Sequence, residues 1–138
     1  MEGRGLRLPH ELDSVMLFVH PPIAIAGHVM TFAYTVLLFL KIPRRRAVLA
    51  GVAAWLLVLL GLVTGMLWAW SAWGSPWSWD PKETAMLLLF LALTGALGAR
   101  IEGRKTLARW LALTACLLSI CTVLVSFLPA GLHSFVGG

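Results

Sequence analysis

The sequence predicts an all-α membrane protein in which four transmembrane helices form an antiparallel bundle. Of its 138 residues, 59% are hydrophobic and only 12% are charged, which is about half the charged share of a soluble domain. Four apolar stretches come close to the roughly 20 residues that a helix needs to cross a bilayer core of about 30 Å. The basic residues lie in short clusters between these stretches, a pattern typical of multispanning membrane proteins and not of nucleic-acid-binding surfaces.

The chain 1–138 is expected to form one domain, with predicted spans at about residues 16–40, 47–68, 81–99 and 110–128. Proline is common in the first turn of a helix, so we expect the first helix to begin at Pro21 and Pro22, and the third at Pro81. Short connections make consecutive helices antiparallel neighbours. The first 14 residues mix acids with bases, and no small-residue cleavage site follows a short apolar run. We therefore expect no cleavable signal peptide and a first span that stays in the mature protein.

The basic residues also predict the orientation of the bundle. Eight of the 11 lie in the connections at 41–46 and 100–109, so the positive-inside rule places both connections in the cytoplasm. Both termini and the loop predicted at 69–83 are then non-cytoplasmic, as are five of the six acidic residues. We expect an integral protein of a prokaryotic plasma membrane or of an organelle membrane.

The predicted outer loop is unusually rich in tryptophan. Five Trp fall within twelve positions, at 68, 70, 73, 77 and 79. An aromatic belt at the membrane interface accounts for one or two Trp at each helix end, but poorly for Trp73, Trp77 and Trp79 in a segment punctuated by Gly, Ser and Pro. The alternative is a platform for a planar, apolar ligand, in which indole rings supply stacking area and their N–H groups face the wet edge.

The segment that follows the tryptophans has the pattern of a helix start. Asp80 suits the N-cap, Pro81 the first helical position and Glu83 the third, which together resemble a capping box. We therefore interpret Asp80 and Glu83 as a helix cap rather than as an acid–base pair. The N–H groups and the positive dipole at this helix start could also face an anionic group of a ligand.

Two histidines flank this region on the predicted outer side. His20 precedes the first prolines, and His133 follows the fourth span. A single interfacial His is usually a solvated residue, but two at similar depth suit the axial positions of a haem iron. His10 lies in a polar lead-in and is expected to be solvated. His28 lies about 12 Å deeper than His20 in a helix, where we favour a hydrogen bond to a neighbouring helix over a ligand role.

The two cysteines, Cys116 and Cys121, lie in the fourth span without a metal-ligand or redox spacing. Five residues apart, they do not share one helix face, and we interpret both as packing residues.

Residues 73–84, WGSPWSWDPKET, closely resemble the WGxxWxWDxKET signature of the tryptophan-rich WWD family. This family handles haem in cytochrome c biogenesis and includes CcsA/ResC, CcmC and CcmF. Residues 8–20 and 131–135 resemble the lead-in and the GLHSY ending of the CcsA branch, whereas the His-Pro-Pro at 20–22 looks more like CcmF. The chain is thus similar to a minimal CcsA/ResC-like core.

The resemblance implies a b-type, non-covalently bound haem on the outer face, with His20 and His133 as axial ligands. The further cofactor-binding residues it implies are Trp73, Trp77, Trp79, Asp80 and Lys82. Lys82 is the preferred partner of a haem propionate, ahead of Arg7. Some relatives hold a second haem through a His between the WWD segment and the last ligand, but this chain has no His between Trp77 and His133, so the resemblance does not extend to that second site.

In function, the resemblance implies a protein that presents haem to the C-x-x-C-H segment of an apocytochrome c. It would work with a membrane subunit resembling ResB/CcsB, as part of a haem-attachment (holocytochrome c synthase) complex rather than as an enzyme alone. Two alternatives stay open: a bis-His membrane cytochrome b for electron transfer, and a structural accessory subunit whose Trp residues form an interface belt. Haem staining separates the last from the others, and cytochrome c yield on deletion separates the first two.

Overall fold

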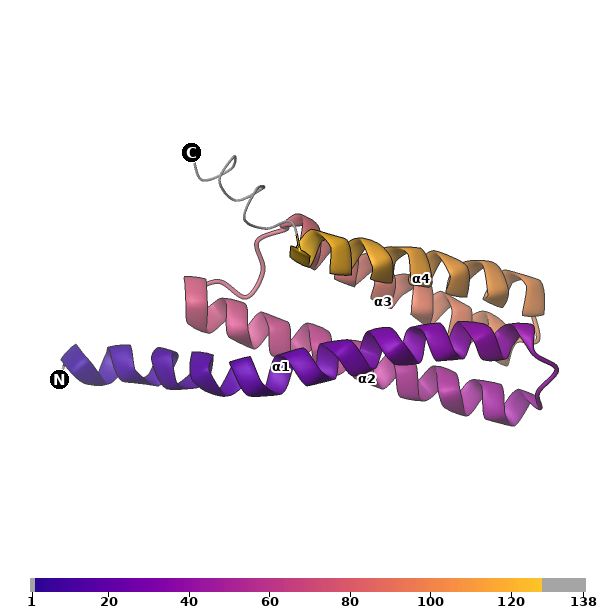
Figure 1. Cartoon of the computed structure of the whole chain (residues 1–138), viewed down its shortest axis with the longest axis horizontal. Coiled ribbons are helices and arrows are strands. Elements are labelled where there is room, and N and C mark those ends of the chain that lie inside the picture. Colours follow the sequence, from indigo (N-terminus) through magenta and orange to yellow (C-terminus); the bar gives the residue numbers. More distant parts are fainter. Residues whose placement is uncertain (1, 128–138) are drawn as a thin grey trace.

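The computed structural model of the chain is described over residues 2–127, without the side chains of residues 2–14, 16, 17, 73, 126 and 127. Within that part of the chain there are four helices and no strand (Figure 1). The helices are α1 (Glu2–Phe39), α2 (Arg44–Trp73), α3 (Pro81–Ile101) and α4 (Lys105–Phe127). The predicted all-α class is confirmed.

Each helix contains a stretch long and apolar enough to cross a membrane, which confirms the membrane-protein class. These stretches are Phe18–Phe39, Arg44–Ala72, Pro81–Ile101 and Lys105–Val125. Only 28–33% of each apolar stretch is buried inside the bundle. Many large apolar side chains of all four helices are exposed on the outside of the bundle, which is the arrangement expected where lipid surrounds the helices.

The helices form two antiparallel hairpins, α1 with α2 and α3 with α4, and the hairpins contact each other through α1–α4 and α2–α3. Figure 1 shows the bundle with the connections 40–43 and 102–104 together at one end. The start of α1 and the segment 74–80 lie toward the opposite end. Residues far apart in the sequence are thereby gathered at each end of the bundle.

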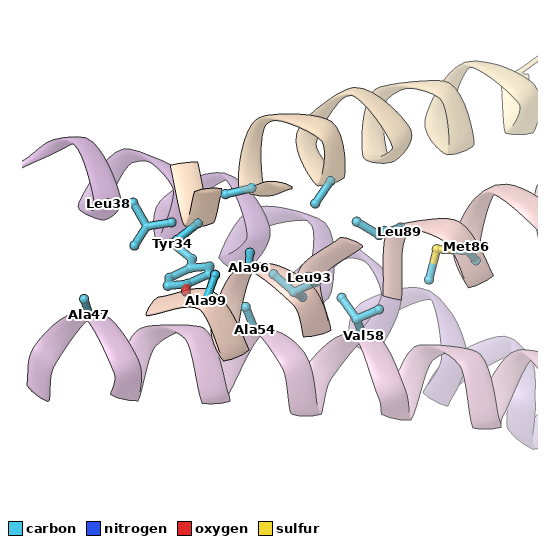
Figure 2. Close-up of a cluster of buried hydrophobic side chains, with 13 residues drawn as sticks. Tyr34, Leu38, Ala47, Ala54, Val58, Met86, Leu89, Leu93, Ala96 and Ala99 are labelled. Atoms are coloured by element: carbon cyan, nitrogen blue, oxygen red, sulfur yellow. The ribbon is translucent and has the colours of Figure 1, made fainter. Parts of the chain in front are cut away.

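Small residues allow the helices to approach closely, as is typical where van der Waals packing drives association in a membrane. The core consists largely of alanines around Tyr34, Val58, Leu89 and Leu93 (Figure 2). Gly51 shows how tight this packing is, because a Cβ there would come within 2.9 Å of the Tyr34 ring.

The predicted start of the first helix at Pro21 and Pro22 is wrong. Instead α1 is continuous from Glu2 to Phe39. Proline lacks an N–H, so the carbonyls of Leu17 and Phe18 lose their usual helical donors, and the proline ring crowds the carbonyl four residues back. Proline is nevertheless tolerated in transmembrane helices, where nearby groups can satisfy the freed carbonyls. With 38 residues, the helix is about 57 Å long and extends well beyond a bilayer core of about 30 Å.

The second helix is longer than the predicted span. Residues 69–73 contain no helix-breaking residue, and α2 ends only where Gly74 adopts a left-handed conformation with φ of 77°. The Gly74 N–H caps the helix by donating to the Trp70 carbonyl at 2.9 Å. Trp68, Trp70 and Trp73 therefore belong to α2, and the loop consists of residues 74–80.

Candidate functional site

The start of α3 is capped as the sequence predicted, with one difference. Asp80 is the N-cap, and its Oδ1 accepts a hydrogen bond from the Glu83 N–H at 2.7 Å. In a standard capping box the Glu83 carboxylate would accept from the Asp80 N–H. Here Glu83 Oε2 accepts instead from the N–H of Ser78 at 2.7 Å and from its hydroxyl at 3.3 Å. Asp80 therefore caps the helix, while the carboxylate of Glu83 holds the loop.

Trp79 lies between these hydrogen bonds and adopts a backbone conformation that is unusual for a residue with a side chain. Its φ is 58°, in the left-handed region that costs a non-glycine residue about 1–2 kcal/mol. Trp79 is 69% exposed. Such strain persists only where the surroundings hold it, and it is concentrated at functional sites. The loop thus presents a large aromatic surface outward at the cost of local stability.

Trp77 packs against Trp79 in an edge-to-face arrangement, with ring centroids 5.4 Å apart and planes at 88°. Its carbonyl accepts a hydrogen bond from the Ser75 hydroxyl at 2.9 Å. The Trp77 Nε1 is buried and has no hydrogen-bond partner among the described residues. A buried indole N–H normally finds an acceptor, so Trp77 has a donor that a bound group could satisfy.

His20 lies on α1 against α2, where the side chains around it determine which ring nitrogen is free. Its Nδ1 is 2.8 Å from Thr64 Oγ1, and the Thr64 hydroxyl donates to the Leu60 carbonyl at 2.8 Å. Because a hydroxyl has one hydrogen, the tautomer of His20 that carries its proton on Nδ1 is the one that satisfies both contacts of Thr64. The lone pair of His20 Nε2 is then available to a metal, in the arrangement that metal-binding histidines commonly show.

Two further residues of α2 shape the position of the His20 ring. A Cβ at Gly65 would come within 3.2 Å of His20 Cε1, so glycine leaves the space that the imidazole occupies. The Trp68 ring lies beside it, with centroids 6.2 Å apart and planes inclined by 31°. The sequence interpretation did not include Thr64, Gly65 and Trp68 among the site residues. Their spacing offers a signal, since Gly61 with Gly65 and Thr64 with Trp68 repeat every four residues, which places each pair on one helix face.

The described residues include most, but not all, of the predicted site. Lys82 is exposed in the first turn of α3 and forms no hydrogen bond or ion pair within residues 2–127. Trp73 is the last residue of α2, and its side chain is outside the description, as are those of Arg7 and His10. His133 lies outside the described residues. The site can therefore be built from His20, from the Trp77–Trp79 pair and from the cap.

His28 forms the interhelical hydrogen bond that was predicted for it. Its Nδ1 is hydrogen-bonded to Ser119 Oγ on α4, and Ser119 is fully buried. The bond links the α1–α2 hairpin to the α3–α4 hairpin. His28 therefore has a packing partner within the bundle that accounts for its position.

The cysteines differ from each other, as their spacing indicated. Cys116 is buried and its Sγ lies 3.0 Å from Thr35 Oγ1, which confirms a packing role. The same interpretation is wrong for Cys121, which is exposed on the outside of the bundle. A separation of five residues rotates a helical side chain well away from the first.

Comparison with known proteins places this arrangement in a family. Residues 3–133 match the family described as "Cytochrome C assembly protein". A cytochrome c biogenesis protein CcsA of Synechococcus sp. (strain RCC307) is 40% identical over 85 residues, covering 58% of this chain and 27% of the relative. CcsA of Prochlorococcus marinus subsp. pastoris is 43% identical over 94 residues, covering 65% of this chain and 29% of the relative.

A third relative, CcsA of Pyropia yezoensis, is 42% identical over 83 residues, covering 57% of this chain and 26% of the relative. The chain thus spans less than a third of the length of these curated relatives. No solved structure gives a significant match.

Proposed function

Because the chain belongs to the cytochrome c assembly protein family, we propose that it binds haem at the Trp-rich end of the bundle and presents it for cytochrome c maturation. We use "Trp-rich end" for the end that contains His20, Thr64, Gly65, Trp68 and the segment 74–82. The observation that carries the proposal is the geometry of His20, whose Nδ1 is held by Thr64 while its Nε2 is left for an axial bond.

The other residues of this end suit the remaining parts of a haem. The exposed indole of Trp79, fixed by the hydrogen bonds on either side of it, offers a face for the porphyrin. The unpartnered Nε1 of Trp77 can donate to a carboxylate. Lys82, exposed one residue into α3, supplies the positive charge for a haem propionate. Trp73 and Asp80 are the remaining residues that we assign to the haem site. Asp80 contributes by fixing the start of α3.

We assign the second axial bond to His133, which lies outside the described residues. The assignment depends on its place after the fourth span, on the same side of the membrane as His20. Two neutral imidazoles would hold a b-type haem without a covalent link to the chain, and would protect its iron from other ligands. By the charge of the opposite connections, we place this end on the non-cytoplasmic side.

When bound, haem supplies the vinyl groups to which cysteine thiols of a C-x-x-C-H segment can be joined. The chain itself holds and orients the cofactor. His20 and His133 fix the iron, the indoles cover a ring face, and Lys82 and Trp77 fix the propionate edge so that the opposite edge stays open to an apocytochrome. We propose that a membrane subunit resembling ResB/CcsB completes the chamber, and that this chain serves as a subunit of the haem-attachment complex.

The axial assignment can be tested with single substitutions in the full chain, purified with its native partners. His20→Ala and His133→Ala should each convert a low-spin haem spectrum to a high-spin one or lose the haem, since each vacates a coordination site. Free imidazole should restore part of the low-spin signal. His28→Ala is the matched control, because His28 is a histidine of the same helix with a partner in the bundle, and it should keep the low-spin spectrum.

The proposal fails if both His20→Ala and His133→Ala keep the wild-type spectrum. Loss of the spectrum in His28→Ala alone would favour the alternative, an intramembrane bis-His cytochrome b. A protein that never stains for haem would be an accessory subunit whose tryptophans serve only as an interface.

A further inference from the structure

The largest concentration of charge lies at the other end of the bundle, away from the Trp-rich end. There residues 41–46 and 100–109, which comprise the two connections and the adjoining helix ends, together carry eight basic residues and one acidic residue. A cavity of about 290 Å³ opens among them, with a lining drawn from all four helices. Its apolar wall includes Leu38, Ile42 and Ala47, and its basic side chains are Lys41, Arg100, Lys105 and Arg109.

The mostly buried charge of Arg100 is the feature of this cavity that has no partner among the described residues. Arg100 is only 8% exposed, yet its side chain forms no hydrogen bond or ion pair within residues 2–127. Arginine does not lose its charge in proteins. The Arg100 nitrogens are not among the fully buried polar atoms, so the guanidinium reaches the cavity that it lines. The single acid of this end, Glu102, is exposed and lies 4.0 Å from Arg104. The described chain therefore supplies no anion for Arg100.

Arg109 is held in place beside the same cavity. Its Nε donates to the Leu38 carbonyl at 3.0 Å, at the C-terminal end of α1, where a cation is favourable. Its guanidinium carbon lies 5.5 Å from the centroid of the Phe39 ring. Its two terminal nitrogens form no hydrogen bond within the described residues. A side chain that is already ordered loses little entropy when it binds a ligand.

We infer that this cavity binds a phosphate group, which Arg100 and Arg109 contact and whose charge Lys41 and Lys105 help to neutralise. Guanidinium groups bind phosphate oxygens in paired hydrogen bonds, which suits an arginine pair in a partly buried site. Basic pockets between transmembrane helices on the cytoplasmic side are a common way to hold anionic lipid head groups. The phosphate could belong to such a head group or be free in solution. The inference does not depend on haem binding at the opposite end.

The test is thermal unfolding of the purified full chain in a neutral detergent, titrated with phosphatidylglycerol, with phosphatidylcholine or with inorganic phosphate. We expect phosphatidylglycerol to raise the unfolding temperature and phosphatidylcholine not to. Arg100→Met and Arg109→Gln should each weaken that response at least tenfold. Arg45→Met is the matched control, because Arg45 is an exposed cation of the same end that does not line the cavity. It should respond like the wild type.

Arg100→Met also separates a binding role from a structural one. Without anionic lipid it should be as stable as the wild type or more so, because it removes a mostly buried charge that has no partner among the described residues. A purely structural Arg100 would instead leave a less stable protein with an unchanged lipid response, and that result would overturn the inference. Should Arg100→Met not fold, Arg109→Gln decides alone.

The titrations also identify the source of the phosphate. An equal response to inorganic phosphate and to phosphatidylglycerol would support a phosphate site that does not need a lipid. A response to the lipid alone would support a head-group site. The inference is overturned if neither ligand stabilises the wild type, or if Arg45→Met weakens the lipid response as much as Arg109→Gln does.

Discussion

Thr64→Val is the substitution that most directly tests whether His20 is positioned for metal binding. Valine has nearly the shape of threonine, but it has no hydroxyl to accept the His20 Nδ1 proton. In the wild type, that hydroxyl lies 2.8 Å from His20 Nδ1 and 2.8 Å from the Leu60 carbonyl. The Leu60 bond is the local one that threonine makes within a helix, so its loss should leave α2 intact. What changes is the hydrogen bond that orients the imidazole.

The size of the effect follows from the environment of that bond. Removing one partner of a partly buried hydrogen bond costs about 1–3 kcal/mol, which corresponds to a change in binding of about 5- to 150-fold at 1.36 kcal/mol per factor of ten. Partners of metal-ligating histidines independently show losses of about 10–100-fold in metal affinity when they are removed. We therefore expect Thr64→Val to weaken haem retention by about 10–100-fold, while the haem that remains bound stays low-spin.

The assay is transfer of haem from the purified protein to an excess of a haem-scavenging apoprotein, followed by absorbance. Thr94→Val is the matched control, because Thr94 also accepts a ring N–H, from Trp55 Nε1 at 2.8 Å, and donates to a helical carbonyl. It lies on α3 and its ring partner is Trp55 rather than His20, so Thr94→Val should retain haem like the wild type. Thr64→Ser keeps the hydroxyl and should restore retention. The reasoning is refuted if Thr64→Val retains haem as the wild type does, or if Thr94→Val loses it equally.

Three further predictions test the rest of this arrangement. In a variant from which Cys116 and Cys121 have been removed, Ser75→Cys should react with a membrane-impermeant thiol reagent only from the non-cytoplasmic side and Gly103→Cys only from the cytoplasm; the reverse pattern would invert the topology. Asp80→Ala should destabilise the protein by about 1 kcal/mol through loss of the N-cap and speed haem loss without changing the axial ligands; a high-spin spectrum would instead give Asp80 a direct role. Gly65→Ala should move the His20 ring, given the 3.2 Å approach, and weaken haem retention even though alanine favours the helix by about 1 kcal/mol; unchanged retention would remove Gly65 from the site.

Much of the architecture was predictable because composition and local sequence determine it. The apolar stretches specify four helices, since a membrane requires internally hydrogen-bonded segments of that length. The start of α3 was predictable to the residue because Asp80, Pro81 and Glu83 act locally. His28 was predictable for a related reason, since a polar side chain within the membrane needs a partner on another helix, and Ser119 supplies it.

The errors arise where local rules leave more than one outcome. A Pro-Pro pair suits a helix start but can also be accommodated within a transmembrane helix, and α1 continues through it. The end of α2 depends on the first available breaker, Gly74, rather than on where the apolar composition fades. The contacts of His20 with Thr64 and Gly65 join residues 44 or more positions apart. They depend on how α1 and α2 pack, which no single stretch of sequence specifies.

The backbone conformation of Trp79 lowers the stability of the loop but suits the ligand binding that we propose for it. A left-handed backbone at a tryptophan is unfavourable, and an indole that is mostly exposed recovers little of that cost through burial. Glu83 opposes the strain from both sides, since its carboxylate holds Ser78 and its N–H is held by Asp80. This arrangement does not favour stability. It does suit the proposed function, which requires a rigid aromatic face for a planar ligand. Under the proposed function, Asp80 and Glu83 would therefore assist haem binding indirectly, by holding the Trp79 ring in place before the haem arrives.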